Sequence, residues 1–241
     1  MFCGESMKRV FAVALLAGFL GLSVLFYSRT YSKVAAVIST GTEKTAKKTV
    51  VIDPGHGGND PGGIGASGVL EKDVNLSIAL FLKSYLEQQG IEVVMTRDTD
   101  KGLYSESARN KKKEDLAKRI EIIKEAAPDF VLCIHQNIFT DPKYSGAQVF
   151  YLQDSAEGAR LAACLQEQLI AGVDPENTRV PKSNMNYYML KNASAPIVIV
   201  ECGFLTNAAE EEKLGTVEYQ RKLAWNIYLG TMHYMNGMGI Q

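Results

Sequence analysis

The segment Val50-Val-Ile-Asp-Pro-Gly-His-Gly-Gly58 joins a β-branched apolar run to a glycine-rich turn that carries a histidine. β-Branched residues favour strands, and the Pro-Gly pair ends the strand near Asp53. Apolar residues then recur at helical spacing from Val74 to Leu86, and Gly90 ends that helix. A strand, a turn and a helix in this order predict the first unit of an α/β domain.

The same alternation continues along the chain. Further strands are expected over residues 91–96, 130–135, 147–152 and 197–201, and further helices over residues 116–127, 161–169 and 217–233. This order predicts a single α/β domain whose largely parallel, twisted sheet is flanked by helices. The polar stretch between Thr99 and Lys113 is long for a connection, so it is interpreted as a functional loop or an insertion.

The N-terminus differs in composition from the rest of the chain. Two basic residues precede an apolar run from Phe11 to Tyr27, which is typical of an export signal or a membrane anchor. We expect a signal peptide or anchor over 1–28, a polar linker over 29–48 and a catalytic domain over 49–241. The apolar run is long for a cleaved signal and short for a span, and an uncleaved anchor is slightly favoured. The protein is therefore expected to be exported, either anchored in a membrane or secreted.

The overall composition excludes some partners. The chain has 241 residues, of which 46% are hydrophobic, and this suits one apolar core with an appendage. Its formal net charge of -1 provides no global field for nucleic acid. The basic runs at 44–48 and 111–113 are interpreted as solvated surface. Cys133, Cys164 and Cys202 are expected to be buried thiols, because the cysteines lack the spacing of a disulfide framework.

Residues with metal-binding and acid–base chemistry occur at the ends of the predicted strands. His56 follows the first strand, His135 ends a buried strand and Glu201 ends the most hydrophobic strand. Ligands of open α/β sheets bind outside the carboxyl ends of the strands, where Glu71 can also reach from the start of its helix. Two imidazoles and a carboxylate form a zinc site with room for water, so zinc is assigned to His56, Glu71 and His135. Glu201 is assigned the role of general base and acid.

Three other features have competing explanations. Gly63-Ile-Gly-Ala-Ser-Gly68 has the spacing of a dinucleotide-binding loop, but it does not directly follow its strand. Cys133 lies two residues before His135, yet no third group is evident to orient such a nucleophilic pair. Asp53 either orients the His56 imidazole or only forms the turn at the strand end. The sequence leaves this last choice open.

At these positions the chain resembles the zinc-dependent N-acetylmuramoyl-L-alanine amidases, the amidase_3 family. The similarity spans about residues 49–236. The motifs that carry it are Ile52-Asp-Pro-Gly-His-Gly-Gly58, Leu70-Glu-Lys-Asp-Val-Asn-Leu76, Thr96-Arg-Asp98, Ile134-His-Gln-Asn137, Ser145-Gly-Ala-Gln148 and Val200-Glu-Cys-Gly-Phe-Leu-Thr-Asn207. Residues 99–119 are most similar to the germination-type amidases of spore-forming bacteria.

The resemblance implies a particular reaction and site. The reaction is hydrolysis of the amide bond between the lactyl group of N-acetylmuramic acid and L-alanine in peptidoglycan, a step toward muramic-δ-lactam in the spore cortex. It implies zinc on His56, Glu71 and His135, with Glu201 catalytic. It also implies action between the forespore and the mother cell, on glycan strands with stem peptides. Because no wall-binding module is evident in the sequence, an activating or targeting protein partner is a further hypothesis.

Two alternatives remain open on the sequence alone. Cys133, Gln136 and Cys202 depart from the residues common in the family, which leaves room for a binding or scaffolding protein without turnover. The same metal chemistry would also serve a zinc peptidase that cuts within the stem peptide.

Overall fold

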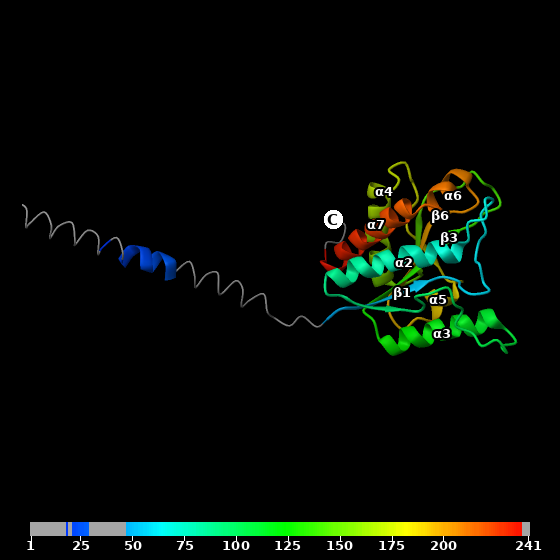
Figure 1. Ribbon diagram of the computed structural model, residues 1–241, viewed down its shortest axis with the longest axis horizontal. Coiled ribbons are helices and arrows are strands. Elements are labelled where there is room, and N and C mark those ends of the chain that lie inside the picture. Colours follow the sequence, from blue (N-terminus) through cyan, green and yellow to red (C-terminus); the bar gives the residue numbers. More distant parts are fainter. Residues whose placement is uncertain (1–17, 19–20, 29–46, 238–241) are drawn as a thin grey trace, which may run out of the picture. The chain divides into compact units, whose positions relative to one another are not determined.

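The computed structural model describes residues 18, 21–28 and 47–237. The chain divides into two units, Met1–Ala46 and Lys47–Gln241. In the first unit, residues 18 and 21–28 are helical (Figure 1). Within the described ranges, no helix is both long and apolar enough to cross a bilayer. The predicted signal or anchor (1–28) and linker (29–48) lie largely outside the described residues, so these boundaries remain predictions.

The second unit contains a six-stranded sheet with the strand order β2-β1-β3-β6-β4-β5. Its strands are β1 (Thr49–Pro54), β2 (Glu92–Met95), β3 (Phe130–Asn137), β4 (Gln148–Leu152), β5 (Lys182–Asn184) and β6 (Ile197–Phe204). Its helices are α2 (Glu71–Gln88), α3 (Lys111–Ala126), α4 (Ala156–Gly172), α5 (Tyr188–Asn192), α6 (Ala208–Leu214) and α7 (Val217–Met235).

The four neighbouring strands β2, β1, β3 and β6 are parallel to one another, and the direction reverses at β4. β1 pairs in parallel with β2 and β3, and β3 pairs in parallel with β6. β4 runs antiparallel to β6, and β5 then pairs in parallel with β4. This confirms the predicted α/β domain with a largely parallel sheet. The short elements β5, α5 and α6 were not predicted from the sequence.

Both faces of the sheet are covered by helices (Figure 1). Alternate residues of β1 separate the two cores: Val50 and Ile52 belong to the core beneath α2, α4 and α7, whereas Val51 belongs to the core beneath α3 and α5. Cys133, Cys164 and Cys202 are free and buried, which confirms the prediction made for these thiols.

The strand register places the chemistry at one edge of the sheet. β3 and β6 pair so that His135 lies opposite Glu201, and residues of a directly paired position point to the same face. The β1 strand ends beside them, with Pro54 paired to Ile134. The polar stretch after Thr99 forms a loop up to Asn110, whose side chain caps α3 by accepting a hydrogen bond from the Lys113 amide.

Candidate metal centre

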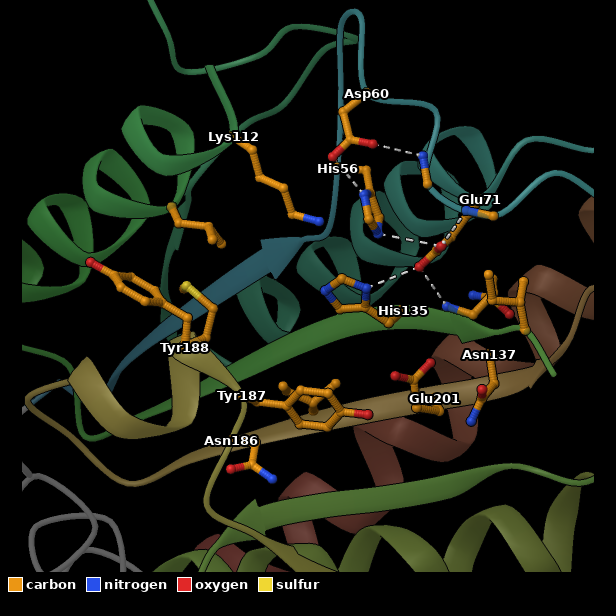
Figure 2. A pocket seen from close by; sticks show the side chains of 17 residues that line it. His56, Asp60, Glu71, Lys112, His135, Asn137, Asn186, Tyr187, Tyr188 and Glu201 are labelled. Carbon is orange, nitrogen blue, oxygen red and sulfur yellow. Dashed lines mark hydrogen bonds and ion pairs between the residues drawn. The ribbon is translucent and has the colours of Figure 1, made fainter. Parts of the chain in front are cut away.

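His56, Glu71 and His135 lie together at the carboxyl end of the sheet (Figure 2). One ligand atom from each residue lies within 4.8 Å of the other two. Glu71 Oε2 is 3.3 Å from His56 Nε2, and Glu71 Oε1 is 2.9 Å from His135 Nδ1. Two atoms bound tetrahedrally to one zinc ion are about 3.4 Å apart. The spacing and the nitrogen–nitrogen–oxygen donor set therefore fit the predicted metal.

The backbone around these ligands requires glycine at two positions. His56 itself has a left-handed conformation with φ of 63°, which is uncommon for a residue other than glycine. A Cβ atom on Gly55 would lie 2.1 Å from His135 Cε1. A Cβ atom on Gly62 would lie 2.6 Å from Glu71 Oε2. Each glycine therefore leaves the space that a ligand side chain occupies.

Glu71 is held by main-chain donors as well as by the histidines. The Gly63 amide donates to Oε2 at 2.7 Å, and the Gln136 amide donates to Oε1 at 3.0 Å. Burial alone would raise the pKa of Glu71, but the hydrogen bonds with His135 and His56 lower it well below its usual range. The carboxylate is therefore ionised and fixed in place. Gly63 opens the glycine-rich stretch that resembled a dinucleotide loop, and its amide instead supports the site.

Asp60 orients the first histidine, a role for which the sequence left Asp53 as the candidate. Asp60 Oδ2 lies 2.8 Å from His56 Nδ1, and the Gly62 amide donates to Asp60 Oδ1 at 3.1 Å. Burial lowers the pKa of His56, but the hydrogen bonds to Asp60 and Glu71 outweigh burial and raise it to about 9. A carboxylate on the outer nitrogen of a ligand histidine fixes the orientation of the ring.

Asp53 instead anchors a buried polar network beneath the metal site. It accepts hydrogen bonds from Thr96 Oγ1 and Arg119 Nη1, both at 2.6 Å. Arg119 Nη2 also donates to the main-chain oxygen of His56 at 2.6 Å. Burial would raise the pKa of Asp53, but the Arg119 charge and these hydrogen bonds lower it. Asp53 therefore supports the His56 loop through Arg119 and forms no hydrogen bond with the imidazole.

Glu201 lies next to the cluster, and one oxygen of its carboxyl group has no hydrogen-bond partner among the described residues. The residue is 8% exposed, and this oxygen, Oε2, is itself buried. Burial raises its pKa to about 7, and Glu71 adds to this effect, while His135 and His56 oppose it. A carboxyl group with a pKa near neutrality can both accept and donate a proton at neutral pH.

A cleft of about 640 Å³ opens over these four residues. Figure 2 shows Lys112 on one side, Tyr187 and Asn186 on another, and Glu201 on the floor beside His135. Sequence reasoning missed Asn186 and Tyr187, which precede the unpredicted helix α5, and it interpreted Lys112 as solvated surface. The hydroxyl of Tyr187 points toward Glu201 in the same view.

The cysteine alternative is excluded by the surroundings of Cys133. This side chain is fully buried, and burial together with the negative charge of Asp53 raises the pKa of its thiol well above its usual value. A nucleophilic cysteine requires a thiolate in an accessible position. Cys133 therefore packs in the core beneath the site, as a small buried residue.

Three side chains that could hold a metal ion and a buried carboxyl group lie together at the carboxyl end of a largely parallel sheet. This arrangement is typical of the class of metal-dependent hydrolases. Residues 50–232 match the family Amidase_3, described as N-acetylmuramoyl-L-alanine amidase. The chain belongs to this family of peptidoglycan amidases, and the predicted family and enzyme class are confirmed.

Individual relatives agree with this assignment. The chain is 37% identical over 195 residues to the germination-specific N-acetylmuramoyl-L-alanine amidase of Bacillus subtilis, covering 80% of this chain and 81% of that protein. It is 31% identical over 252 residues to the amidase AmiA of Escherichia coli, covering 87% of this chain and 82% of that protein. The CwlD amidase of Clostridioides difficile, solved in complex with the GerS lipoprotein, superposes with a TM-score of 0.77 at 40% identity, covering 79% of this chain and 100% of that one.

Proposed function

We propose that this chain binds zinc through His56, Glu71 and His135 and uses Glu201 to hydrolyse the bond between the lactyl group of N-acetylmuramic acid and L-alanine in spore-cortex peptidoglycan. The observation that carries the proposal is the buried Glu201 carboxyl, with one oxygen left without a hydrogen-bond partner among the described residues, beside three convergent ligands in an open cleft. A structural carboxyl at this depth would be expected to have partners for both oxygens.

Zinc, when bound, supplies a water molecule that is nucleophilic at neutral pH and polarises the substrate carbonyl. The chain prepares the position for the ion. Asp60 fixes the His56 ring, and the Gly63 and Gln136 amides fix the Glu71 carboxylate. These contacts hold the donor atoms in place before the metal arrives.

Glu201 is the group placed to move protons. It accepts a proton as the water oxygen forms its bond to the lactyl carbonyl carbon, and it delivers that proton to the nitrogen of L-alanine as the carbon–nitrogen bond breaks. The products are a lactyl carboxylate on the glycan and a stem peptide with a free amino terminus. A pKa of about 7 allows the same carboxyl to perform both transfers.

A role in the spore cortex is supported by the relatives. The B. subtilis relative is named a germination-specific amidase, and the matched C. difficile structure is a complex with a lipoprotein. We infer that this chain acts outside the cytoplasm, between forespore and mother cell, that the apolar run 11–27 anchors or exports it, and that a protein partner activates or targets it. Labelling of introduced cysteines with a membrane-impermeant reagent tests the location, and labelling only after lysis would contradict it.

The experiment that tests the reaction uses the zinc-loaded full-length protein and peptidoglycan freed of attached polymers. Mass spectrometry is expected to show stem peptides with a free N-terminal L-alanine and glycan with an intact lactyl carboxyl group. Products cut between two amino acids would instead identify a zinc peptidase. Tight binding without any product would identify a scaffolding protein.

The ligand assignment has its own test. His135→Ala is expected to lose bound zinc in metal analysis, while His233→Ala, on the outer helix α7, is expected to keep it. Full zinc occupancy in the His135 variant would remove this residue from the ligand set.

A further inference from the structure

Lys112 brings a positive charge into the catalytic cleft. It is the second residue of α3, and Figure 2 shows its side chain extending from that helix toward His56 and His135. It lines both the main cleft and a smaller hollow of about 50 Å³ to which the two histidines also contribute. Neither neighbouring lysine of the 111–113 run lines the cleft.

The amino group of Lys112 has no assigned partner, in contrast to the lysine before it. Lys111 forms a 2.6 Å ion pair with Glu106 and lies 5.1 Å from the centre of the Tyr104 ring. Within the described part of the chain, Lys112 takes part in neither a hydrogen bond nor an ion pair. A cation that extends into a substrate cleft without an internal partner is available to a ligand.

The acidic groups beside Lys112 are already engaged. Both oxygens of Asp60 are used, one by His56 and one by the Gly62 amide. Both oxygens of Asp115 are also used, because Oδ1 accepts from the Leu103 amide at 2.7 Å and Oδ2 accepts from Arg119 Nε at 2.6 Å. Lys112 acts on Asp60 only through its field, as one of the weaker contributions that lower the pKa of Asp60 after its hydrogen bond to His56.

Helix stability does not account for a lysine at this position. Positive side chains in the first turn of a helix are unfavourable, because the helix N-terminus carries a partial positive charge. The cap of α3 is supplied by Asn110, and Lys112 itself is exposed rather than packed. The residue therefore contributes little to the fold, and its position in the cleft is the feature that needs an explanation.

We propose that Lys112 binds a carboxylate of the stem peptide and thereby sets the preference of the enzyme for stems with a free, rather than an amidated, carboxyl group. The inference rests on the proposed function, because it identifies the leaving group as a stem peptide. The glycan strand offers no charge once its lactyl group is in amide linkage, so the stem is the anionic part of the substrate. Its second residue, a γ-linked D-glutamate, carries an α-carboxyl group that is either free or amidated.

The distance and the charge balance of the cleft agree with this partner. The second stem residue follows L-alanine directly, so its α-carboxyl lies roughly 4–7 Å from the scissile amide. Asp60, Glu71 and Glu201 are acidic groups of the cleft, and a zinc ion bound to Glu71 would offset much of their charge. Lys112 adds a positive charge on the side formed by α3, where opposite charges favour the correct orientation of the substrate.

The experiment compares two substrates that differ only at the α-carboxyl group of the second stem residue. The zinc-loaded full-length protein is given a glycan tetrasaccharide bearing L-alanyl-γ-D-glutamyl-L-alaninamide, with the glutamate α-carboxyl group either free or amidated, and kcat and KM are measured for each. The wild type is expected to prefer the free carboxylate. Lys112→Gln is expected to lower the kcat/KM ratio of free to amidated substrate about tenfold, mainly by raising KM for the anionic stem.

Three further variants complete the test. Lys112→Arg is expected to keep the preference within about threefold of the wild type, because the charge remains. Lys112→Glu is expected to favour the amidated stem. Lys113→Gln, one position along α3 and outside the cleft, is the matched control and should retain the wild-type ratio.

The outcomes separate this inference from the proposed function. If the wild type cleaves both substrates and Lys112→Gln lowers both kcat/KM values equally, the carboxylate assignment is wrong while the amidase reaction stands. If the wild type cleaves neither substrate and releases no stem from whole peptidoglycan, the proposed function fails and the assignment of Lys112 fails with it.

Discussion

Asp53 and Glu201 are carboxyl groups buried at the same edge of one sheet, but their surroundings differ. Asp53, near the end of β1, is 1% exposed and accepts 2.6 Å hydrogen bonds from Thr96 and Arg119. Glu201, in β6, is 8% exposed and has one oxygen without a hydrogen-bond partner among the described residues. The pKa of Asp53 is lowered despite its burial, whereas burial raises the pKa of Glu201 to about 7.

The difference shows that burial alone does not determine what a carboxyl group can do. A buried carboxylate that accepts hydrogen bonds from a cation and a hydroxyl group stays ionised and stabilises the fold. Asp53 does this here by supporting the His56 loop through Arg119. A buried carboxyl with a free oxygen exchanges its proton near neutral pH and is suited to catalysis. Four measurements test this contrast.

The largest effect is expected for Glu201→Gln. The amide is close in size but cannot accept the proton of the attacking water, so kcat should fall on the order of 10³- to 10⁴-fold. Zinc content should remain near that of the wild type, and the melting temperature should not fall. Glu157→Gln, at an exposed position far from the cleft, is the control for the same chemical change. Near-native turnover in the metal-loaded Glu201 variant would show that another group transfers the proton.

Arg119→Met makes the surroundings of Asp53 resemble those of Glu201. It leaves Asp53 buried without its cation, so the free energy of unfolding should fall by about 3–5 kcal/mol in urea titrations at neutral pH. Adding Asp53→Asn to this variant should restore part of the loss, because the uncompensated charge is then removed. Arg160→Met breaks an exposed pair with Glu157 and should cost about 1 kcal/mol or less. Equal losses at Arg119 and Arg160 would contradict the contrast.

The two carboxyl groups should also show opposite pH dependence of stability in the zinc-free protein. Glu201 has a folded pKa of about 7 against an ordinary value of 4.5, so its stabilising contribution is present below about pH 4.5 and is lost as pH rises through 7. The stability advantage of Glu201→Gln over the wild type should therefore grow by about 3 kcal/mol between pH 4 and pH 8.

Asp53 supplies the opposite slope in the same measurement. Its folded pKa is lowered from 3.8, so its contribution is present above that value and is lost as pH falls through the folded pKa. The deficit of Asp53→Asn relative to the wild type should therefore shrink on acidification. If both variants showed the same sign of pH dependence in denaturant titrations, the assigned environments would be wrong.

The smallest effect is expected for Asp60→Asn, which replaces a carboxylate whose surroundings are intermediate between those of Asp53 and Glu201. Asp60 is partly exposed and bound to His56, and that hydrogen bond lowers its pKa to about 2. Its loss should weaken zinc binding by about 10- to 100-fold, because the His56 ring is held less firmly. Competition with a chelator measures the change, and Asp141→Asn, in an exposed loop pair with Lys143, should leave zinc binding unaltered. Unchanged zinc affinity in the Asp60 variant would show that the ring needs no such support.

Much of the fold and the convergence of the site could be predicted from the sequence. Buried parallel strands are continuous apolar runs, and their carboxyl ends meet at one edge, so residues after separate strands had to lie close together. That argument placed His56, His135 and Glu201 correctly relative to one another, and Glu71 followed because it begins the next helix. The direction of β4 could not be predicted in this way, because its alternation of residues is the same in a parallel or an antiparallel strand.

Other features depended on the backbone path. Asp53 and Asp60 lie three residues before and four residues after His56, so spacing alone allowed either to orient the ring. The left-handed φ of His56 turns the chain so that Asp60 approaches the imidazole while Asp53 remains beneath the loop. The position of Lys112 in the cleft could not be predicted either. A run of lysines has the composition of solvated surface, and only the packing of α3 brings one of them to the cleft.

Gly55 and Gly62 have a consequence for genetics and for engineering. A single methyl group at either position would collide with a ligand side chain, although neither glycine contributes a chemical group. A screen for inactive alleles should therefore recover substitutions at these two codons as readily as at the histidine codons, in proteins that retain every donor atom. Anyone adapting this centre to a different ion would have to keep glycine at these two positions before choosing new donor residues.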